Sequence, residues 1–343
     1  MSEVSYSVHD HLRQTRQLIH AHAQSISKSR ISSIIRSKAL CWAIVHDDFV
    51  AVASEDIYIY KISDGSLIRV IKVTYNSIHS MVALGDSLLI CFYASTNCFR
   101  IFDWRLGELT ATIICNVCGV DPLHKNMLVY NNRYMISNGQ KLGLWDLKTC
   151  RVSVLTKLRH VTCLEYGFED DSFLCGMSNG SLRVASLQGF FYGCTTESHA
   201  GAVSCITLIS KNKFASAGRD SFVYVWDSQL NLCRKIKTHY NLVTCLSPIS
   251  GDYFCTASGD SKICVWDSIS GEFVCAIHEY SAKSLEVAIA CKGTRLLSMY
   301  ENTAYVWDLD VDSLRMCLHK QRLLSHAIDG DGAYKDISIT TVH

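Results

Sequence analysis

The sequence predicts an all-β fold in which one unit of four short strands is repeated around a ring. Three observations support this prediction. One pattern of His, Asp and Trp-Asp is written twice in residues 199–267. Equivalent residue pairs then recur along the chain at intervals of 40 to 43 residues. Finally, short runs of β-forming residues alternate with turn residues, without the helical segments that separate the strands of βαβ proteins.

The doubled pattern indicates a repeat protein. His199 is followed after 21 residues by Asp220, and Asp220 after six residues by Trp226. The same spacings lead from His239 to Asp260 and then to Trp266, 40 residues further along the chain. A second copy in register is the sequence signature of repeated structural units.

From the N-terminus, residues 1–28 are polar and predict an extension. Within it, Val8, Leu12, Ile19 and Ala23 lie at helical spacing and predict a short amphipathic helix over residues 7–21. A first strand is expected over residues 30–37. Four consecutive strands then follow at residues 39–45, 48–54, 56–62 and 66–73, separated by turn residues.

The register of the repeat is set by the residue pair that ends each third strand. These pairs are Tyr60-Lys61, Phe102-Asp103, Trp145-Asp146, Ala185-Ser186, Trp226-Asp227, Trp266-Asp267 and Trp307-Asp308. Seven such units favour a radial array, because neighbouring sheets then bury both of their faces and closure protects most strand edges.

These residues resemble the WD-repeat family over residues 30–318. The resemblance implies a β-propeller of four-stranded antiparallel blades, here placed in residues 29–343, with seven blades expected and eight as the alternative. It also implies a structural set of four residues in each well-preserved repeat. Those sets are His199, Ser216, Asp220 and Trp226 in one repeat, and His239, Thr256, Asp260 and Trp266 in the next.

Two further repeats match this pattern in part. The seventh is expected to keep His278, Ser298 and Trp307. The fourth is expected to keep His160, with Asn179 and Ala185 in place of Asp and Trp.

We expect these sets to be structural rather than catalytic. A buried indole N–H needs an acceptor, which a hydroxyl on the second strand supplies, and the hydroxyl in turn satisfies the His. The presence of two copies inside a repeated unit, without a GxSxG motif, argues against a hydrolase. No catalytic residue, cofactor or metal is therefore expected.

The closure of the ring has competing candidates. A strand from one terminus usually completes the last blade in the family that the chain resembles, and residues 30–37 are one candidate. Residues 313–320 are predicted to form a strand that competes for the same position. Residues 321–343 predict a hairpin with a DGDG turn, which would contribute to an eighth blade.

Composition limits the classes of function. A formal net charge of +1 gives no support for broad contact with nucleic acid or anionic membrane. No apolar run approaches the roughly 18–20 residues that span a bilayer. The 17 cysteines are expected to be reduced, mostly buried thiols. A cytoplasmic location is expected, with the nucleus left open.

The predicted function is a non-enzymatic scaffold that docks a protein or peptide within a hetero-complex. Tyr and Arg in the turns of a rigid scaffold are the residue types that dominate binding energy. The predicted partner-binding residues are Arg159, Arg219, Tyr240, Asn241, Tyr280 and Tyr300.

Two alternative functions remain open. Residues 102–105 resemble in part the WDxR box of substrate receptors of cullin-based ubiquitin ligases, with Asp103 and Arg105 as the matching residues. The second alternative is a component of an RNA-processing or ribosome-associated particle.

Overall fold

The computed structural model describes most of the chain between residues 27 and 319. The described ranges are 27–31, 41–46, 48–73, 78–93, 95–96, 98–114, 127–137, 142–155, 160–169, 171–188, 190–249, 252–260, 262–277, 287–292, 295–300, 303–309, 311–312 and 314–319. The predicted N-terminal helix (residues 7–21) and the predicted C-terminal hairpin (residues 321–343) lie outside these residues.

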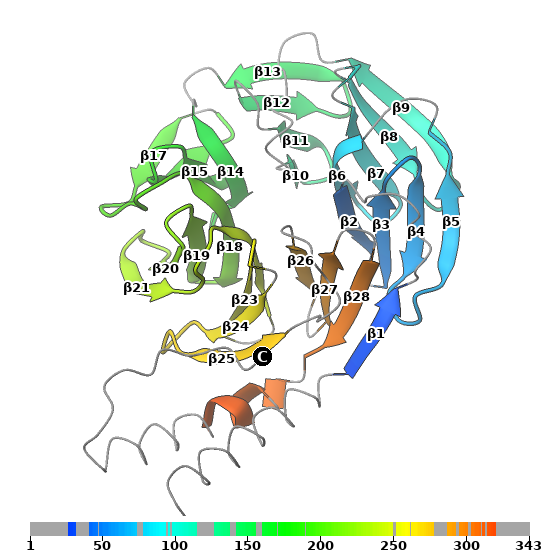
Figure 1. The fold of residues 1–343 in the computed structure, drawn as a ribbon. Coiled ribbons are helices and arrows are strands. Elements are labelled where there is room, and N and C mark those ends of the chain that lie inside the picture. The colour runs from blue at the N-terminus through cyan, green and yellow to red at the C-terminus, as the bar shows by residue number, and fades with distance from the viewer. Residues whose placement is uncertain are drawn as a thin grey trace, which may run out of the picture.

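The described residues form seven four-stranded antiparallel sheets, here called blades 1 to 7 (Figure 1). Blade 1 comprises β2 (Cys41–His46), β3 (Phe49–Ala53), β4 (Ile57–Lys61) and β5 (Leu67–Ile71). Blade 2 comprises β6 (Ile78–Leu84), β7 (Leu88–Tyr93), β8 (Cys98–Asp103) and β9 (Glu108–Ile114). Blade 3 comprises β10 (Met127–Tyr130), β11 (Tyr134–Ser137), β12 (Leu142–Asp146) and β13 (Arg151–Leu155).

The remaining blades repeat the same connectivity. Blade 4 comprises β14 (Val161–Tyr166), β15 (Ser172–Met177), β16 (Leu182–Ser186) and β17 (Phe191–Cys194). Blade 5 comprises β18 (Val203–Ser210), β19 (Lys213–Gly218), β20 (Phe222–Asp227) and β21 (Leu232–Lys237). Blade 6 comprises β22 (Val243–Pro248), β23 (Tyr253–Ser258), β24 (Ile263–Asp267) and β25 (Phe273–Ile277). Blade 7 combines β26 (Val287–Lys292), β27 (Arg295–Tyr300) and β28 (Thr303–Asp308) with β1 (Ser27–Ile31).

We label the four strands of each blade a to d in their order across the sheet. Strand a lies nearest the centre of the ring and strand d lies at its rim (Figure 1). Because neighbouring strands are antiparallel, the turns that join b to c lie at one end of the ring and the turns that join c to d lie at the other. We call these ends the b–c face and the c–d face. The segments from strand d to the next strand a open on the b–c face.

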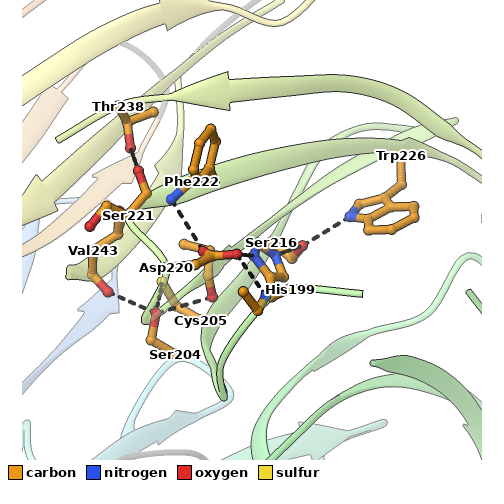
Figure 2. Close-up of polar contacts among 12 residues, drawn as sticks. His199, Ser204, Cys205, Ser216, Asp220, Ser221, Phe222, Trp226, Thr238 and Val243 are labelled. Carbon is orange, nitrogen blue, oxygen red and sulfur yellow. Dashed lines mark hydrogen bonds and ion pairs between the residues drawn. The ribbon is translucent and has the colours of Figure 1, made fainter. Parts of the chain in front are cut away.

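The cores lie between blades. One cluster joins Val223 and Ile236 of blade 5 to Phe254 and Trp266 of blade 6. The innermost strands are also linked by hydrogen bonds. The Ser204 hydroxyl lies 3.1 Å from the Ala217 carbonyl of its own blade and 2.7 Å from the Val243 carbonyl of blade 6 (Figure 2). Each blade is therefore fixed by its neighbours on both faces.

Ring closure brings together residues from both ends of the described chain. β1 pairs antiparallel with β28, with Ser27 opposite Asp308 and Ile31 opposite Ala304. Blades 1 and 7 also share a core cluster that contains Tyr60 and Leu297. The predicted strand at residues 30–37 was misplaced, because the pairing strand begins at Ser27 and ends at Ile31.

The predicted strand at residues 313–320 is wrong, because residues 311–312 and 314–319 are helical. Leu314 and Leu318 are four residues apart and both are buried, so they form one face of a helix rather than alternating across a strand. That face packs against Val274 and Cys275 of β25. Because this segment is helical, it does not form the outer strand of blade 7, and β1 takes that position.

No helix in the described part of the chain is long and apolar enough to cross a membrane.

Candidate partner-binding face

In blade 5, the predicted four-residue set forms a continuous chain of hydrogen bonds (Figure 2). The Trp226 indole N–H donates to the Ser216 hydroxyl at 2.9 Å, and Ser216 Oγ lies 2.9 Å from His199 Nε2. His199 Nδ1 lies 3.0 Å from Asp220 Oδ1. These contacts are all hydrogen bonds when Ser216 donates to His199 Nε2 and the protonated Nδ1 of His199 donates to the Asp220 carboxylate.

The environment keeps His199 neutral. Burial lowers the pKa of the imidazole, and the Asp220 carboxylate opposes this shift in part. The ring also stacks on Tyr224, with centroids 4.0 Å apart. A neutral imidazole with one donor and one acceptor is what the hydrogen-bond chain requires.

Blade 6 repeats the arrangement. His239 Nε2 lies 2.7 Å from Thr256 Oγ1, and the Trp266 indole donates to the same hydroxyl at 3.0 Å. His239 Nδ1 lies 3.1 Å from Asp260 Oδ2. Burial works to raise the pKa of Asp260, but the hydrogen bond and charge interaction with His239 help to hold it below its usual value.

Blade 7 keeps the predicted bond between the Trp307 indole and the Ser298 hydroxyl, at 2.8 Å. His278 lies outside the described residues. The assignment of His160 in blade 4 is wrong, because its side chain is exposed. His160 directly precedes β14, whereas His199 and His239 each precede their strand by four residues.

The sets cannot serve a hydrolytic reaction in this arrangement. Ser216 and Thr256 are completely buried, and each hydroxyl already accepts a hydrogen bond from Trp. A nucleophile must reach a reacting carbonyl, which neither hydroxyl does. Among the described residues, no group of three or more His, Cys, Asp or Glu side chains is arranged to hold a metal ion.

Gly180 joins blade 4 to the His of blade 5. Its φ is +87°, its carbonyl accepts the His199 N–H at 3.0 Å, and a Cβ at this position would lie 2.1 Å from the His199 carbonyl oxygen. We expect Gly180→Ala to destabilise the fold by about 2–3 kcal/mol, because it combines an unfavourable φ with a clash against backbone. Urea unfolding measures this loss.

Gly107 provides the matched control for Gly180. Its φ is +83°, but the nearest atoms to an added Cβ belong to the flexible Arg69 side chain. Gly107→Ala is expected to cost only about 1 kcal/mol. Equal losses for the two variants would contradict the backbone contact.

Glu165, on the innermost strand of blade 4, has a raised pKa. Burial raises the pKa of this carboxyl to about 7, against the opposing effect of the Tyr166 backbone N–H. Unfolded Glu165 ionises near its ordinary value of about 4.3, so its stabilising contribution falls as pH rises from there to about 7. Glu165→Gln is therefore expected to raise stability at pH 8 by about 1–3 kcal/mol, with little effect at pH 4. Thermal unfolding of both proteins at the two pH values measures the difference, and an equal effect at both would contradict it.

The b–c face carries three of the predicted partner-binding residues. Arg219 is exposed in the turn between β19 and β20. Tyr240 is 81% exposed and Asn241 is exposed beside it, in the segment that leads from β21 to β22. Hydrogen bonds from the Thr238 backbone and side chain to the Ser221 carbonyl tie these two turns together.

Leu242 belongs to the same surface and was missed. It is 38% exposed, and the Asn241 side chain accepts its backbone N–H at 2.7 Å. Its carbonyl accepts a hydrogen bond from Ser258 of blade 6 at 2.9 Å. We define the b–c patch as Arg219, Tyr240, Asn241 and Leu242.

The structure does not place the other three predicted residues on the b–c patch. Arg159 and Tyr280 lie outside the described residues. Tyr300 is the last residue of β27, where its backbone pairs with Thr303, rather than part of a loop. Its side chain also lies outside the described part of the structure.

Asp103 and Arg105 lie on the opposite, c–d face. The Asp103 carboxylate accepts the backbone N–H groups of Arg105 and Leu106, each at 2.9 Å, and so shapes the turn after β8. The exposed Arg105 guanidinium lies 5.4 Å from the centre of the Trp104 ring. This pair is therefore separate from the b–c patch.

The blades, their order and their shared cores define a β-propeller. Residues 192–227 and 230–267 match the family model described as WD domain, G-beta repeat. Residues 192–227 and 230–267 are thus WD repeats, and they lie within a β-propeller of four-stranded antiparallel blades. No curated protein has a significantly similar sequence.

Proposed function

We propose that this propeller is a non-enzymatic scaffold that docks a protein partner on the b–c patch, within a hetero-complex. The observation that supports the proposal most is the exposure of Tyr240, at 81%, beside Leu242 and Arg219 on turns that are tied together by hydrogen bonds. Tyr and Arg are enriched among the residues that dominate binding energy, and turns that are already ordered add little backbone ordering cost on binding.

WD-repeat propellers generally bind protein partners. The buried hydrogen-bond chains of blades 5 and 6 hold the turns on either side of the b–c patch. Asp220 also accepts the backbone N–H of Ala200 at 3.0 Å, and Asp260 accepts that of Lys262 at 3.1 Å. The polar sets thus position the docking surface, and we assign them no contact with the partner.

Affinity capture tests the proposal with the double variant Tyr240→Ala, Arg219→Ala. The variant is expected to lose at least about tenfold of the specifically captured partner, because removal of a hot-spot residue costs about 2 kcal/mol or more. Its melting temperature is expected to stay unchanged. Mass spectrometry with a quantitative label provides the readout.

Ile269→Ala provides the control for that capture. Ile269 is 54% exposed in the c–d turn of blade 6, so it lies on the opposite face from the b–c patch. This variant is expected to retain the partner. Retention of every partner by the double variant would place the interface elsewhere.

The ligase-receptor hypothesis is a second candidate, favoured only by the exposure of Arg105 on its ordered turn. It predicts capture of the linker subunit of a cullin ligase and loss of that capture in Arg105→Ala. Unchanged capture in the variant would eliminate the hypothesis.

We also infer that blades 1 to 7 make up the complete ring. The support is the shared core of blades 1 and 7 and the ion pair between Arg295 and Asp48, at 3.2 Å, which join the first and last blades directly. An eighth blade would have to separate them.

A further inference from the structure

A second surface, on the rim of blades 1 and 2, is unusually apolar. Thirteen large hydrophobic residues are exposed in the described part of the chain, and six of them lie on β5, β9 and the turn before β9. These six are Leu67, Ile68, Val70, Leu106, Leu109 and Ile114. On β5, Leu67 pairs with Tyr60 and Val70 with Tyr58, and both tyrosines pack in the cluster between blades 1 and 7, so these two residues face away from blade 2. We call Leu106, Leu109 and Ile114, all from blade 2, the rim patch.

The strand pairing shows which way the rim patch faces. Leu109 pairs with Phe102 and Ile114 pairs with Cys98, and both partners belong to the core cluster between blades 1 and 2. Cross-strand neighbours share a face of the sheet, so Leu109 and Ile114 face blade 1. From blade 1, the Arg69 guanidinium reaches across to the Leu106 carbonyl at 3.1 Å.

Blade 6 shows how an apolar outer strand is covered in this fold. There β25 packs against the helical residues 314–319, and both Val274 and Cys275 are buried (Figure 1). By contrast, the first four residues of β5 are all exposed, and so are the first three of β9. Within the described residues nothing comparable covers the rim patch.

The charges beside the rim patch favour an acidic occupant. Arg69 and Arg105 are exposed, and neither has a carboxylate partner within ion-pair distance among the described residues. By comparison, Lys72 pairs with Asp56 and Arg133 pairs with Asp146. The exposed Glu108 at the start of β9 offsets one of the two arginine charges, and the Asp103 carboxylate in the same turn is bound by the backbone N–H groups of Arg105 and Leu106.

We propose that the rim patch binds an amphipathic helix of a protein partner. The apolar face of that helix packs on Leu106, Leu109 and Ile114, as the helix at residues 314–319 packs on β25. Acidic side chains along the edge of its apolar face pair with Arg69 and Arg105. This surface lies apart from the b–c patch, so the scaffold holds two partners at once.

Two labelled helical peptides of about 16 residues, long enough for about four turns, test the proposal on the full chain. Both carry leucines on one face. One carries Glu along the edges of that face and the other carries Lys. The Glu peptide is expected to bind with micromolar affinity, at least about tenfold more tightly than the Lys peptide at low salt, with the difference shrinking as salt increases.

Variants of the patch locate the binding. Leu106→Ser with Leu109→Ser is expected to abolish binding, while Ile269→Ser, at an equally exposed c–d turn of blade 6, retains it. Arg69→Ala with Arg105→Ala is expected to remove most of the preference for the Glu peptide. Unchanged melting temperatures show that the variants remain folded.

Three peptide results would overturn the proposal: the absence of peptide binding, equal binding of the two peptides, and binding that survives the double leucine change. Evidence that something other than a partner helix covers the rim patch would also overturn it. A dimer that dissociates in the leucine variant would identify a second copy of the chain, and peptide binding that requires removal of residues 1–26 would identify the chain's own N-terminal segment.

Discussion

Removal of residues 1–31 is expected to abolish cooperative folding of the propeller, or to lower its melting temperature by about 10 °C or more. The truncation deletes β1, which pairs along its whole length with β28. Blade 7 then has three strands, and the backbone groups of β28 become an unprotected edge that favours aggregation. Differential scanning calorimetry and light scattering measure the two effects.

Removal of residues 1–26 is the matched control for that truncation. It leaves Ser27–Ile31 and the pairing with β28 in place, so the two truncated proteins differ by five residues. The shorter deletion is expected to keep a single cooperative transition close to that of the full chain. Equal melting temperatures for the two truncated proteins would show that β1 does not close the ring.

Ser216→Ala is expected to destabilise the protein by about 3–4 kcal/mol. The substitution leaves the Trp226 indole N–H and His199 Nε2 without their partner, in positions from which water is excluded. Each orphaned buried group costs about 1–3 kcal/mol. Urea unfolding at pH 7 gives the loss, and Thr256→Val is expected to behave in the same way in blade 6.

A double-mutant cycle separates the hydrogen bonds from packing. Trp226→Phe removes the donor, so the additional loss on changing Ser216 to Ala in that background is expected to be smaller. The resulting coupling energy is expected to be about 1–2 kcal/mol. A cost below about 0.5 kcal/mol for Ser216→Ala alone is the range of ordinary surface substitutions and would contradict the structural role.

The repeat and its polar sets were predictable because they are local and doubled. His199, Asp220 and Trp226 recur at the same spacing as His239, Asp260 and Trp266, and the structure joins each set as predicted. In the fourth repeat this reasoning failed, because only one residue type matched. The distance from His160 to the start of β14 was the available signal, and it differs from the other repeats.

The closing strand was harder to predict for a physical reason. Residues 27–31, SKSRI, have no apolar alternation, and their strand conformation is fixed by the edge of β28, which is remote in sequence. The helix at residues 314–319 had a readable signal in the spacing of Leu314 and Leu318. That signal was overridden by the expectation of a fourth strand for the last blade.

Surface exposure was predictable only where residue type and turn position coincided. Tyr240 met both conditions and is exposed. The rim patch did not, because Leu109 and Ile114 lie in a strand, and apolar strand residues are normally assigned to the core. Their exposure follows from the position of β9 at the outer edge of its blade.

We propose that the buried sets hold the blades while the turns between them bind a partner. Hydrogen exchange of the captured complex tests it most directly. Slower exchange on binding is predicted in the turns at residues 218–221 and 238–242, with no change in the c–d turn at residues 228–231. Unchanged exchange in both b–c face turns, with protection confined to other surfaces, would contradict the claim.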